Sequence, residues 1–354
     1  MAVNALIFRS GDTGTITLPG NWNNNDNFIM LIGAGAGGSS SCWSNNFNGT
    51  YNFNSGGGGG SGAFILTNNV QLVPGATYNY QTGVGGLLGT DPISSGNPIP
   101  DARVADPTRF WNDSLTVDLH AGGGQGGRHI DYTTGGLGGA GGTVESLIGQ
   151  GTGTISRNGA PGGNGVTRTS SLGTFWLPGG GGGGCPGPDG PGGAGENGGA
   201  TSTTSPGLAG AGVGGDSNGG SAGGGEWMLG GYYTTSSTFH NYTTFQNLVN
   251  SNGGIVSSFS SAFTLTGINP TLQQFRTIYR ADGGRTIMTP ESRHFGAGTA
   301  GAKSSTQLNS TQYPGRGGGG GAGQGLATCV ADRGGFGMLI LCWKTTSESG
   351  MNFC

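Results

Sequence analysis

The sequence predicts a mainly β protein with little α-helix, in which the two ends of the chain build a β-scaffold and glycine-rich tracts pack between its strands. Three observations lead to this prediction. Glycine accounts for 84 of the 354 residues, well above its usual share of about 7 %. It is concentrated in tracts, with 23 glycines in the 48 residues of 178–225 but 10 in the 88 residues of 226–313. Sequence outside the tracts has the residue patterns of β-strands.

The expected strands lie near both ends of the chain. Thr13–Leu18 alternates threonine with Gly14, Ile16 and Leu18, as a half-buried strand does. Phe28–Ile32 is apolar at every position, which suits a strand covered on both faces. Gly337–Trp343 has a similar composition, so we expect the chain ends to meet in one sheet. Further strands are expected at Val3–Phe8, Ala63–Leu66, Val70–Leu72 and Tyr78–Gln81, and helical patterns occur only at Phe245–Asn250 and Pro270–Ala281.

The glycine tracts cover approximately residues 33–62, 122–165, 178–225 and 315–337. Residues 123–128 (GGQGGR) and 135–143 (GGLGGAGGT) repeat Gly-Gly-X, and a polyproline-II-type helix has three residues per turn, which places X on one edge. The glycine edges can then approach neighbouring segments closely enough to pair their backbone N–H and C=O groups. We therefore expect polyglycine-II helices; glycine-rich loops on a β-scaffold and disorder are the alternatives. Collagen is excluded because Glu196 interrupts the glycine triplets that begin at Gly184.

The charge and cysteine content exclude several classes of protein. Only 9 % of the residues are charged, and no Lys or Arg lies between Arg168 and Arg276, so the clustered cations that bind nucleic acid are absent from the sequence. Membrane insertion is not expected, because the longest apolar run, Phe28–Gly38, is about half of the ~20 residues needed. The first ten residues also lack a secretory signal pattern. The five cysteines have no zinc-binding spacing, and we expect buried free thiols.

A cofactor is not expected. Gly33, Gly35 and Gly38 follow an apolar strand with the spacing of a dinucleotide-binding turn. However, no helical pattern comes after them, and the next acidic residue is Asp91, too distant to bind a ribose. The glycine run 179–184 is not followed by the Lys-Ser/Thr of a phosphate-binding loop.

Catalytic patterns are equally sparse. No serine lies in a GxSxG elbow, and the acidic residues are dispersed. His120, near Asp118, is the best isolated candidate for an acid–base pair. A single histidine beside an acid is more often a surface hydrogen-bonded pair. We therefore expect that the protein is not an enzyme.

Five segments resemble a known family when they are taken in order: TITLPGNW, FIMLIGAGAGG, GGGGGSGAF, PGATYNYQTGVGG and GGFGMLILCW. The sequence resembles the glycine-rich domain of tail-fibre and other tail-associated proteins of bacteriophages. The resemblance covers the first 90 residues and the last 30, with the glycine tracts between them. It also extends to the polyglycine-II-type adhesins of long tail fibres, although this sequence has no heptad repeat or long shaft.

The resemblance implies a virion structural protein of the tail or host-contact apparatus, at a fibre tip or associated with the baseplate, that acts by binding. The alternatives are a protein that decorates the capsid or forms a head appendage and, from another class, a glycan-degrading enzyme. A homo-oligomer is expected, with a trimer favoured by the symmetry of phage fibres. The other expected partners are virion proteins and a host surface glycan or outer-membrane protein.

We divide the chain into a glycine-rich scaffold, residues 1–225 and 314–354, and an inserted segment, Glu226–Tyr313. Candidate receptor or subunit contacts are aromatic residues and arginines in two stretches with little glycine, Leu87–Leu119 and Glu226–Tyr313. They are Phe110, Trp111, Trp227, Tyr232, Tyr233, Phe239, Tyr242, Phe245, Arg276, Arg280 and Arg285. Alternatively, the aromatic residues form a small second core, and the arginines form a solvated patch.

Overall fold

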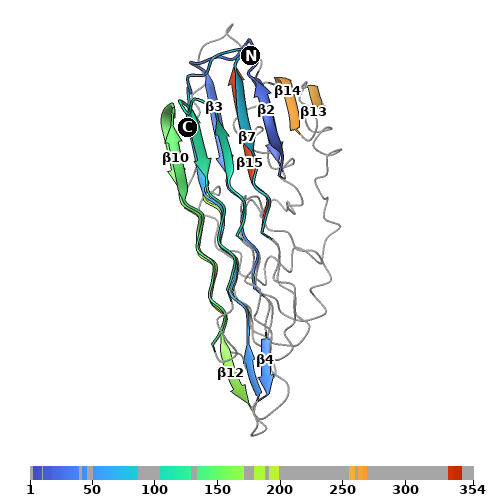
Figure 1. Ribbon diagram of the computed structural model, residues 1–354, viewed down its shortest axis with the longest axis vertical. Helices are drawn as coiled ribbons and strands as arrows, with labels where there is room; N and C mark the ends of the chain where they lie inside the picture. Colours follow the sequence, from blue (N-terminus) through green and yellow to red (C-terminus); the bar gives the residue numbers. More distant parts are fainter. Residues whose placement is uncertain are drawn as a thin grey trace.

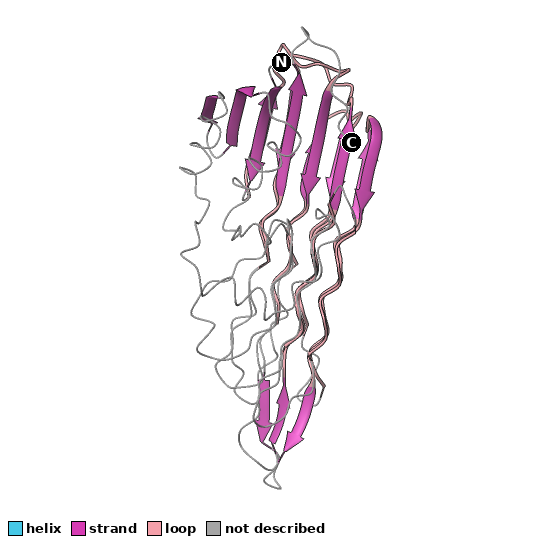
Figure 2. Cartoon of the chain, turned by 180° about the vertical axis from the view of Figure 1, so that it is seen from behind, coloured by secondary structure: helices cyan, strands magenta, loops and turns pink. Residues whose placement is uncertain are grey.

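The computed structural model describes residues 3–9, 11–39, 42–45, 51–86, 104–128, 134–170, 179–187, 191–198, 255–259, 262–268 and 334–344. All regular secondary structure in these ranges is β-strand, which confirms the prediction of a mainly β protein with little α-helix. The molecule is elongated (Figure 1). Two sheets lie at one end and a small sheet at the other, and long segments without regular secondary structure connect them (Figure 2).

The strands form three antiparallel sheets. The first has the spatial order β11 (Thr152–Arg157), β6 (Phe64–Asn68), β3 (Asn27–Ile32), β15 (Met338–Lys344), β1 (Val3–Arg9), β14 (Ala262–Ile268) and β13 (Ile255–Phe259). The second has the order β10 (Val144–Ile148), β9 (Asp118–Ala121), β8 (Thr108–Trp111), β7 (Thr77–Gln81) and β2 (Thr13–Thr17). The third, at the far end, consists of β12 (Thr167–Ser170), β5 (Tyr51–Asn54) and β4 (Cys42–Asn45).

The central strands confirm that the chain ends meet. β15 pairs with β1 on one side and with β3 on the other, both antiparallel. Every residue of β3 and β15 is buried, as predicted for strands covered on both faces. Cys342 of β15 is a buried free thiol, and burial raises its pKa far above the usual range. Cys185 is also buried and is not in a disulfide, so the prediction of buried thiols is confirmed for these two cysteines.

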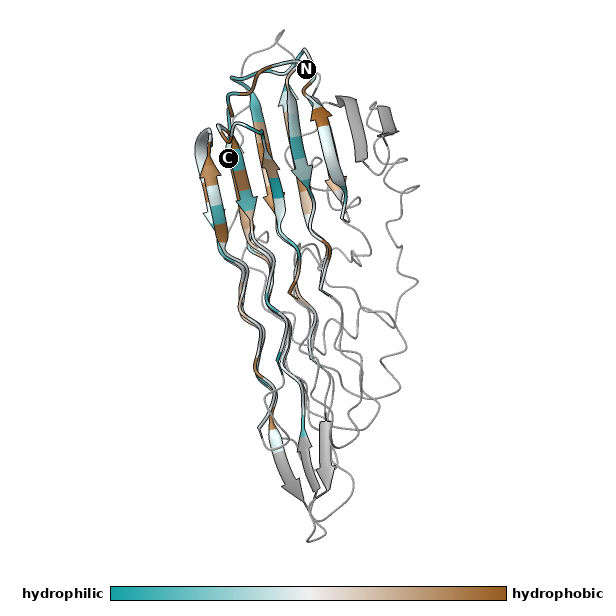
Figure 3. Cartoon of the chain, viewed as in Figure 1, coloured by the Kyte–Doolittle hydropathy of each residue, from teal (hydrophilic) through white to brown (hydrophobic). Residues whose placement is uncertain are grey.

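The seven-stranded and five-stranded sheets face each other across one apolar core. Alternate residues of each strand point inward, because successive side chains of a strand lie on opposite faces. The seven-stranded sheet contributes Leu31, Leu339 and Leu341, and the five-stranded sheet contributes Phe110 and Leu119, all fully buried. Strongly apolar residues are concentrated in this sandwich and are only scattered along the connecting segments (Figure 3).

One predicted strand needs correction. Val70–Leu72 is not a strand, because the amide oxygens of Asn27 and Asn24 accept the N–H groups of Val70 and Leu72 at 2.9 Å each and replace a neighbouring strand. Within Leu87–Leu119, one of the two stretches with little glycine, residues 108–111 and 118–121 form β8 and β9 of the five-stranded sheet.

The segment 226–313 contributes two described strands, β13 and β14. β14 pairs with β1 and thereby extends the seven-stranded sheet. Both predicted helices lie outside the described residues.

Candidate functional site

The body between the sheets is built on the glycine segment 55–63, which bonds to each neighbouring segment at every third residue. Its backbone N–H groups at positions 55, 58 and 61 donate to a segment that runs antiparallel to it. The pairs are Ser55 with Val166, Gly58 with Gly163 and Ser61 with Ala160, at 3.0, 2.9 and 2.9 Å. On both segments, therefore, the backbone group that bonds to the other segment recurs at every third residue.

The other positions of segment 55–63 bond to further neighbours with the same step. Its carbonyl oxygens accept hydrogen bonds from the backbone N–H groups of three further segments. Positions 55, 58 and 61 accept from Gly136, Gly139 and Gly142, and positions 57, 60 and 63 accept from Ser39, Ala36 and Gly33. Positions 56 and 59 accept from Gly180 and Gly183. The segment is therefore surrounded by backbone and bonded to it in several directions. This differs from a β-sheet, where hydrogen bonds lie in one plane.

Glycine is required where these segments approach one another. A Cβ atom added to Gly58 would overlap the carbonyl group of Gly181, and one added to Gly139 would overlap that of Gln125. In the Gly-Gly-X segment 135–143, the X residues Leu137, Ala140 and Thr143 are exposed, whereas Gly136, Gly139 and Gly142 are buried. Exposed X residues and buried glycines thus alternate with the three-residue period that the Gly-Gly-X repeat predicts. The polyglycine-II assignment itself stays a prediction.

Three buried serines complete the backbone hydrogen bonding of the body. Ser61 Oγ accepts the N–H group of Ala160 at 2.8 Å and donates to the carbonyl oxygen of Gly184 at 2.8 Å. Ser55 Oγ accepts the N–H group of Val166, and Ser39 Oγ accepts that of Gly57, each at 2.8 Å. Sequence reasoning missed these residues, because serine in a glycine tract is equally typical of a linker.

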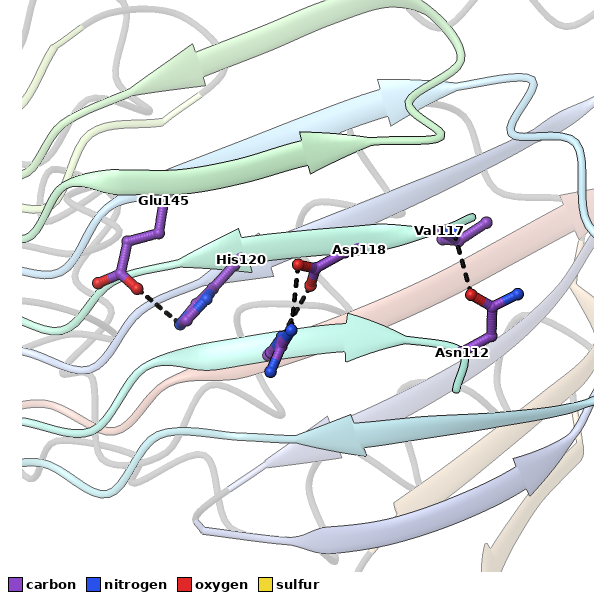
Figure 4. Close-up of polar contacts among 6 residues, drawn as sticks. Asn112, Val117, Asp118, His120 and Glu145 are labelled. Carbon is purple, nitrogen blue, oxygen red and sulfur yellow. Dashed lines mark hydrogen bonds and ion pairs between the residues drawn. The ribbon is translucent and has the colours of Figure 1, made fainter. Parts of the chain in front are cut away.

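The outer face of the five-stranded sheet carries a network of paired polar side chains (Figure 4). Arg109 of β8 binds Asp118 of β9 through two nitrogens, at 2.7 and 3.1 Å. The guanidinium group of Arg109 also lies 4.7 Å from the ring centre of Trp111. Burial alone would raise the pKa of Asp118, but the hydrogen bond and charge of Arg109, with smaller contributions from a Ser146 hydrogen bond and the charge of His120, together lower it. The Asp118 hydrogen bond is likewise the main reason that the pKa of Arg109 is raised.

His120 belongs to the same face and lies beside Glu145. Its Nε2 is 3.1 Å from Glu145 Oε2, an ion-pair distance, although the two groups are not aligned as a hydrogen bond. Burial lowers the pKa of His120, and the positive charge of Arg109 adds to this effect, whereas Glu145 and Asp118 oppose it. His120 lies near Asp118, as the sequence suggested, and the charge of each acts on the pKa of the other, but its ion-pair neighbour is Glu145 of the adjacent strand β10. Cross-strand neighbours lie nearer than a residue two positions along the same strand.

The pairs on this face connect neighbouring strands, because Arg109–Asp118 joins β8 to β9 and His120–Glu145 joins β9 to β10. Among the residues that the structure describes, no three His, Cys, Asp or Glu side chains are grouped so that they could hold a metal ion.

The predicted contact residues divide into three groups. Phe110 is fully buried and stacks on Tyr78 with ring centres 5.2 Å apart, so the prediction that its side chain makes a surface contact is wrong. Trp111, the next residue, lies half-buried on the outer face. The other predicted contacts lie outside the described residues: Trp227, Tyr232, Tyr233, Phe239, Tyr242, Phe245, Arg276, Arg280 and Arg285.

No known protein family matches the sequence, and no curated protein is similar to it. Within the described ranges, the structure contains no helix long and apolar enough to cross a membrane.

Proposed function

We propose that this chain is a bacteriophage virion structural protein of the tail or host-contact apparatus, and that it acts by binding. The observation that carries the proposal is the glycine-rich body, which joins a β-sandwich at one end to a three-stranded sheet at the other (Figure 2). Such a body holds two ends of a molecule apart at a fixed separation. This is useful to a protein that connects a particle to a surface.

The glycine segments are proposed to be polyglycine-II helices. Support comes from the hydrogen bonds in several directions around segment 55–63 and from their three-residue step. Among the described glycines, positive φ values occur only at Gly11, Gly75, Gly149 and Gly153, outside the bonded segments, as left-handed polyglycine-II helices require. Measured φ and ψ near −75° and +145° in residues 33–39 and 55–63 would establish this, and β-region values that alternate in a plane would contradict it.

The segment 226–313 is proposed to contribute contacts to receptor or subunit, together with Trp111. Its proposed partners are other virion proteins, further copies of the chain in a trimer, and a host glycan or outer-membrane protein. The virion is the proposed location.

The test of this function is the position of the protein in intact particles and its effect on adsorption. Gold-labelled antibody should decorate the tail or its tip, and purified full-length protein should compete with particles for binding to host cells. A matched protein with Trp111→Ala and the arginines 276, 280 and 285 changed to alanine should compete less well. Labelling of the capsid alone, or competition equal to that of an unrelated glycine-rich protein, would contradict the proposal. Capsid labelling would replace it with capsid decoration.

A further inference from the structure

The edge strand β2 of the five-stranded sheet has no neighbouring strand on one side among the residues that the structure describes. The N–H group of Leu18 donates to Ala76, and that of Thr82 donates to Asp12, both at 2.8 Å. With the register of β2 on β7, the even-numbered residues therefore point their backbone groups at β7. The backbone groups of the threonines at 13, 15 and 17 point away from the sheet. These threonines are exposed, and β2 is the last strand of its sheet among the described residues.

This edge lacks the features that usually prevent a further strand from pairing. Natural edge strands are blocked by charges, prolines or bulges. The edge strand β10 has a register irregularity between Val144 and Ser146 and carries the charged Glu145. The edge strand β11 is irregular between Thr152 and Ile155, and its Gly153 has a φ of 57°. β2 pairs regularly along its whole length and contains no charged residue or proline.

The two sheets of the sandwich also differ in width on this side. Phe8 of β1 contacts Tyr80 of β7, with ring centres 4.1 Å apart, so β1 lies above the β7–β2 side of the smaller sheet. β14 and β13 continue the larger sheet beyond β1, past the edge of β2 (Figure 1). No described strand of the five-stranded sheet lies opposite them. A strand added to β2 would therefore be covered on its inner face by β14.

We propose that the β2 edge binds an extended arm of another polypeptide chain by strand addition. The arm is uncharged and apolar at every second residue, because its inward side chains would face β14 and its outward side chains would continue the threonine face of β2. A second copy of the sandwich does not fit. Antiparallel pairing of two β2 edges about a twofold axis would place β14 and β13 of each copy where the seven-stranded sheet of the other lies.

The test uses full-length protein labelled with ¹⁵N-threonine and a capped synthetic peptide of residues 76–82 (ATYNYQT), which has the required alternation. The peptide should bind saturably and slow the hydrogen exchange of the Thr13, Thr15 and Thr17 amides. Thr15→Pro removes one outward N–H group, at an edge position where proline is tolerated, and should weaken binding by about tenfold or more. Thr15→Val keeps the N–H group and should bind as the wild type does.

A peptide with N-methyl groups on the residues that would pair should not bind the wild-type protein. This control keeps the test valid even if Thr15→Pro disturbs the fold. Unprotected threonine amides, or equal binding of the methylated and unmethylated peptides, would overturn the proposal. An edge of this kind can serve a binding protein of any origin. Failure of the peptide test would therefore overturn strand addition at β2 and leave the virion assignment standing. Labelling of particles tests the virion assignment alone.

Discussion

The sandwich and the glycine body achieve burial by different means. In the sandwich, large side chains such as Ile29, Leu341 and Phe110 are removed from water, and the backbone bonds lie within each sheet. In the body, the buried groups around Gly58 are mostly peptide units, bonded to neighbours in several directions. The hydrophobic effect scales with buried apolar area, whereas a backbone hydrogen bond contributes only about 0.5–1.5 kcal/mol net.

The comparison shows that the two regions tolerate opposite changes. A core of large side chains is damaged by removing atoms, because the cavity is not refilled. A body of close backbones is damaged by adding atoms, because its segments would have to separate. Each of the following substitutions tests one side of this difference.

The largest effect is expected for Phe110→Ala. The ring is fully buried between the sheets, and loss of a buried phenylalanine destabilises a protein by about 3–5 kcal/mol. Denaturant unfolding followed by the fluorescence of Trp22 and Trp343, which are in contact in the sandwich, measures it. Trp111→Ala on the same strand is the control. Equal losses of stability from Phe110→Ala and Trp111→Ala would show that the inward face of β8 contributes no more to stability than its outward face.

Gly58→Ala should destabilise the glycine body by about 1–3 kcal/mol or more, as overpacking does. The added methyl group would overlap the Gly181 carbonyl and separate two segments. Hydrogen exchange of residues 55–63 and 160–166 should rise, while exchange in β3 and β15 changes less. Gly20→Ala is the matched control, since no atom lies within 4 Å of the added Cβ. If Gly58→Ala is no less stable than Gly20→Ala, close approach of backbone segments is not the reason for glycine in these tracts.

Ser61→Ala should cost about 2 kcal/mol, because the N–H group of Ala160 loses a buried partner. The same substitution also removes the hydrogen bond to Gly184. Thermal unfolding measures the difference, with Ser114→Ala, at an exposed serine, as the control. If Ser61→Ala and Ser114→Ala have equal melting temperatures, the hydroxyl group is not needed.

Acidification should weaken the sandwich through His120. Burial lowers its pKa below 6.5 in the folded protein, so the unfolded chain binds the proton more readily. The stability associated with the neutral imidazole is present above pH 6.5 and is lost as the pH falls through that value toward the folded pKa. Between pH 7.5 and 5 the denaturation midpoint of the wild type should fall more than that of His120→Gln. Parallel curves would refute this role.

The smallest effect is expected for Leu137→Ser. Replacing a core leucine by serine would strongly lower the stability, but the side chain of Leu137 is 45 % exposed. Surface substitutions usually change the free energy of unfolding by less than about 0.5 kcal/mol. Thermal unfolding against Leu31→Ala, in the sandwich, is the direct comparison. A loss comparable to that of Leu31→Ala would mean that the X edge is buried in an assembly.

The sequence predicts strands where side chains alternate or are continuously apolar. That is why β2, β3 and β15 were expected near their observed positions, and why pairing of the chain ends was inferred from the similarity of β3 and β15. It fails at Val70–Leu72, which looks like a strand but is bonded by asparagine side chains. The pattern of residues does not reveal when a side chain replaces a neighbouring strand.

The surface contacts were harder to predict because adjacent residues of a strand face opposite ways. Phe110 and Trp111 are equivalent as sequence, and only the register of β8 on β7 and β9 separates core from surface. The serines of the glycine body had no distinguishing signal. Ser55 and Ser61 flank the run Gly56–Gly60, but their roles depend on segments about 100 residues away.

The direction of the backbone bonds in the glycine body has a mechanical consequence. The bonded segments run along the length of the molecule, and their hydrogen bonds connect one segment to the next across that direction (Figure 1). A pull on the two ends therefore loads these bonds in shear, so that many must break together, whereas peeling a single segment sideways breaks them one at a time. The body should resist tension along its axis better than a sideways load of the same size.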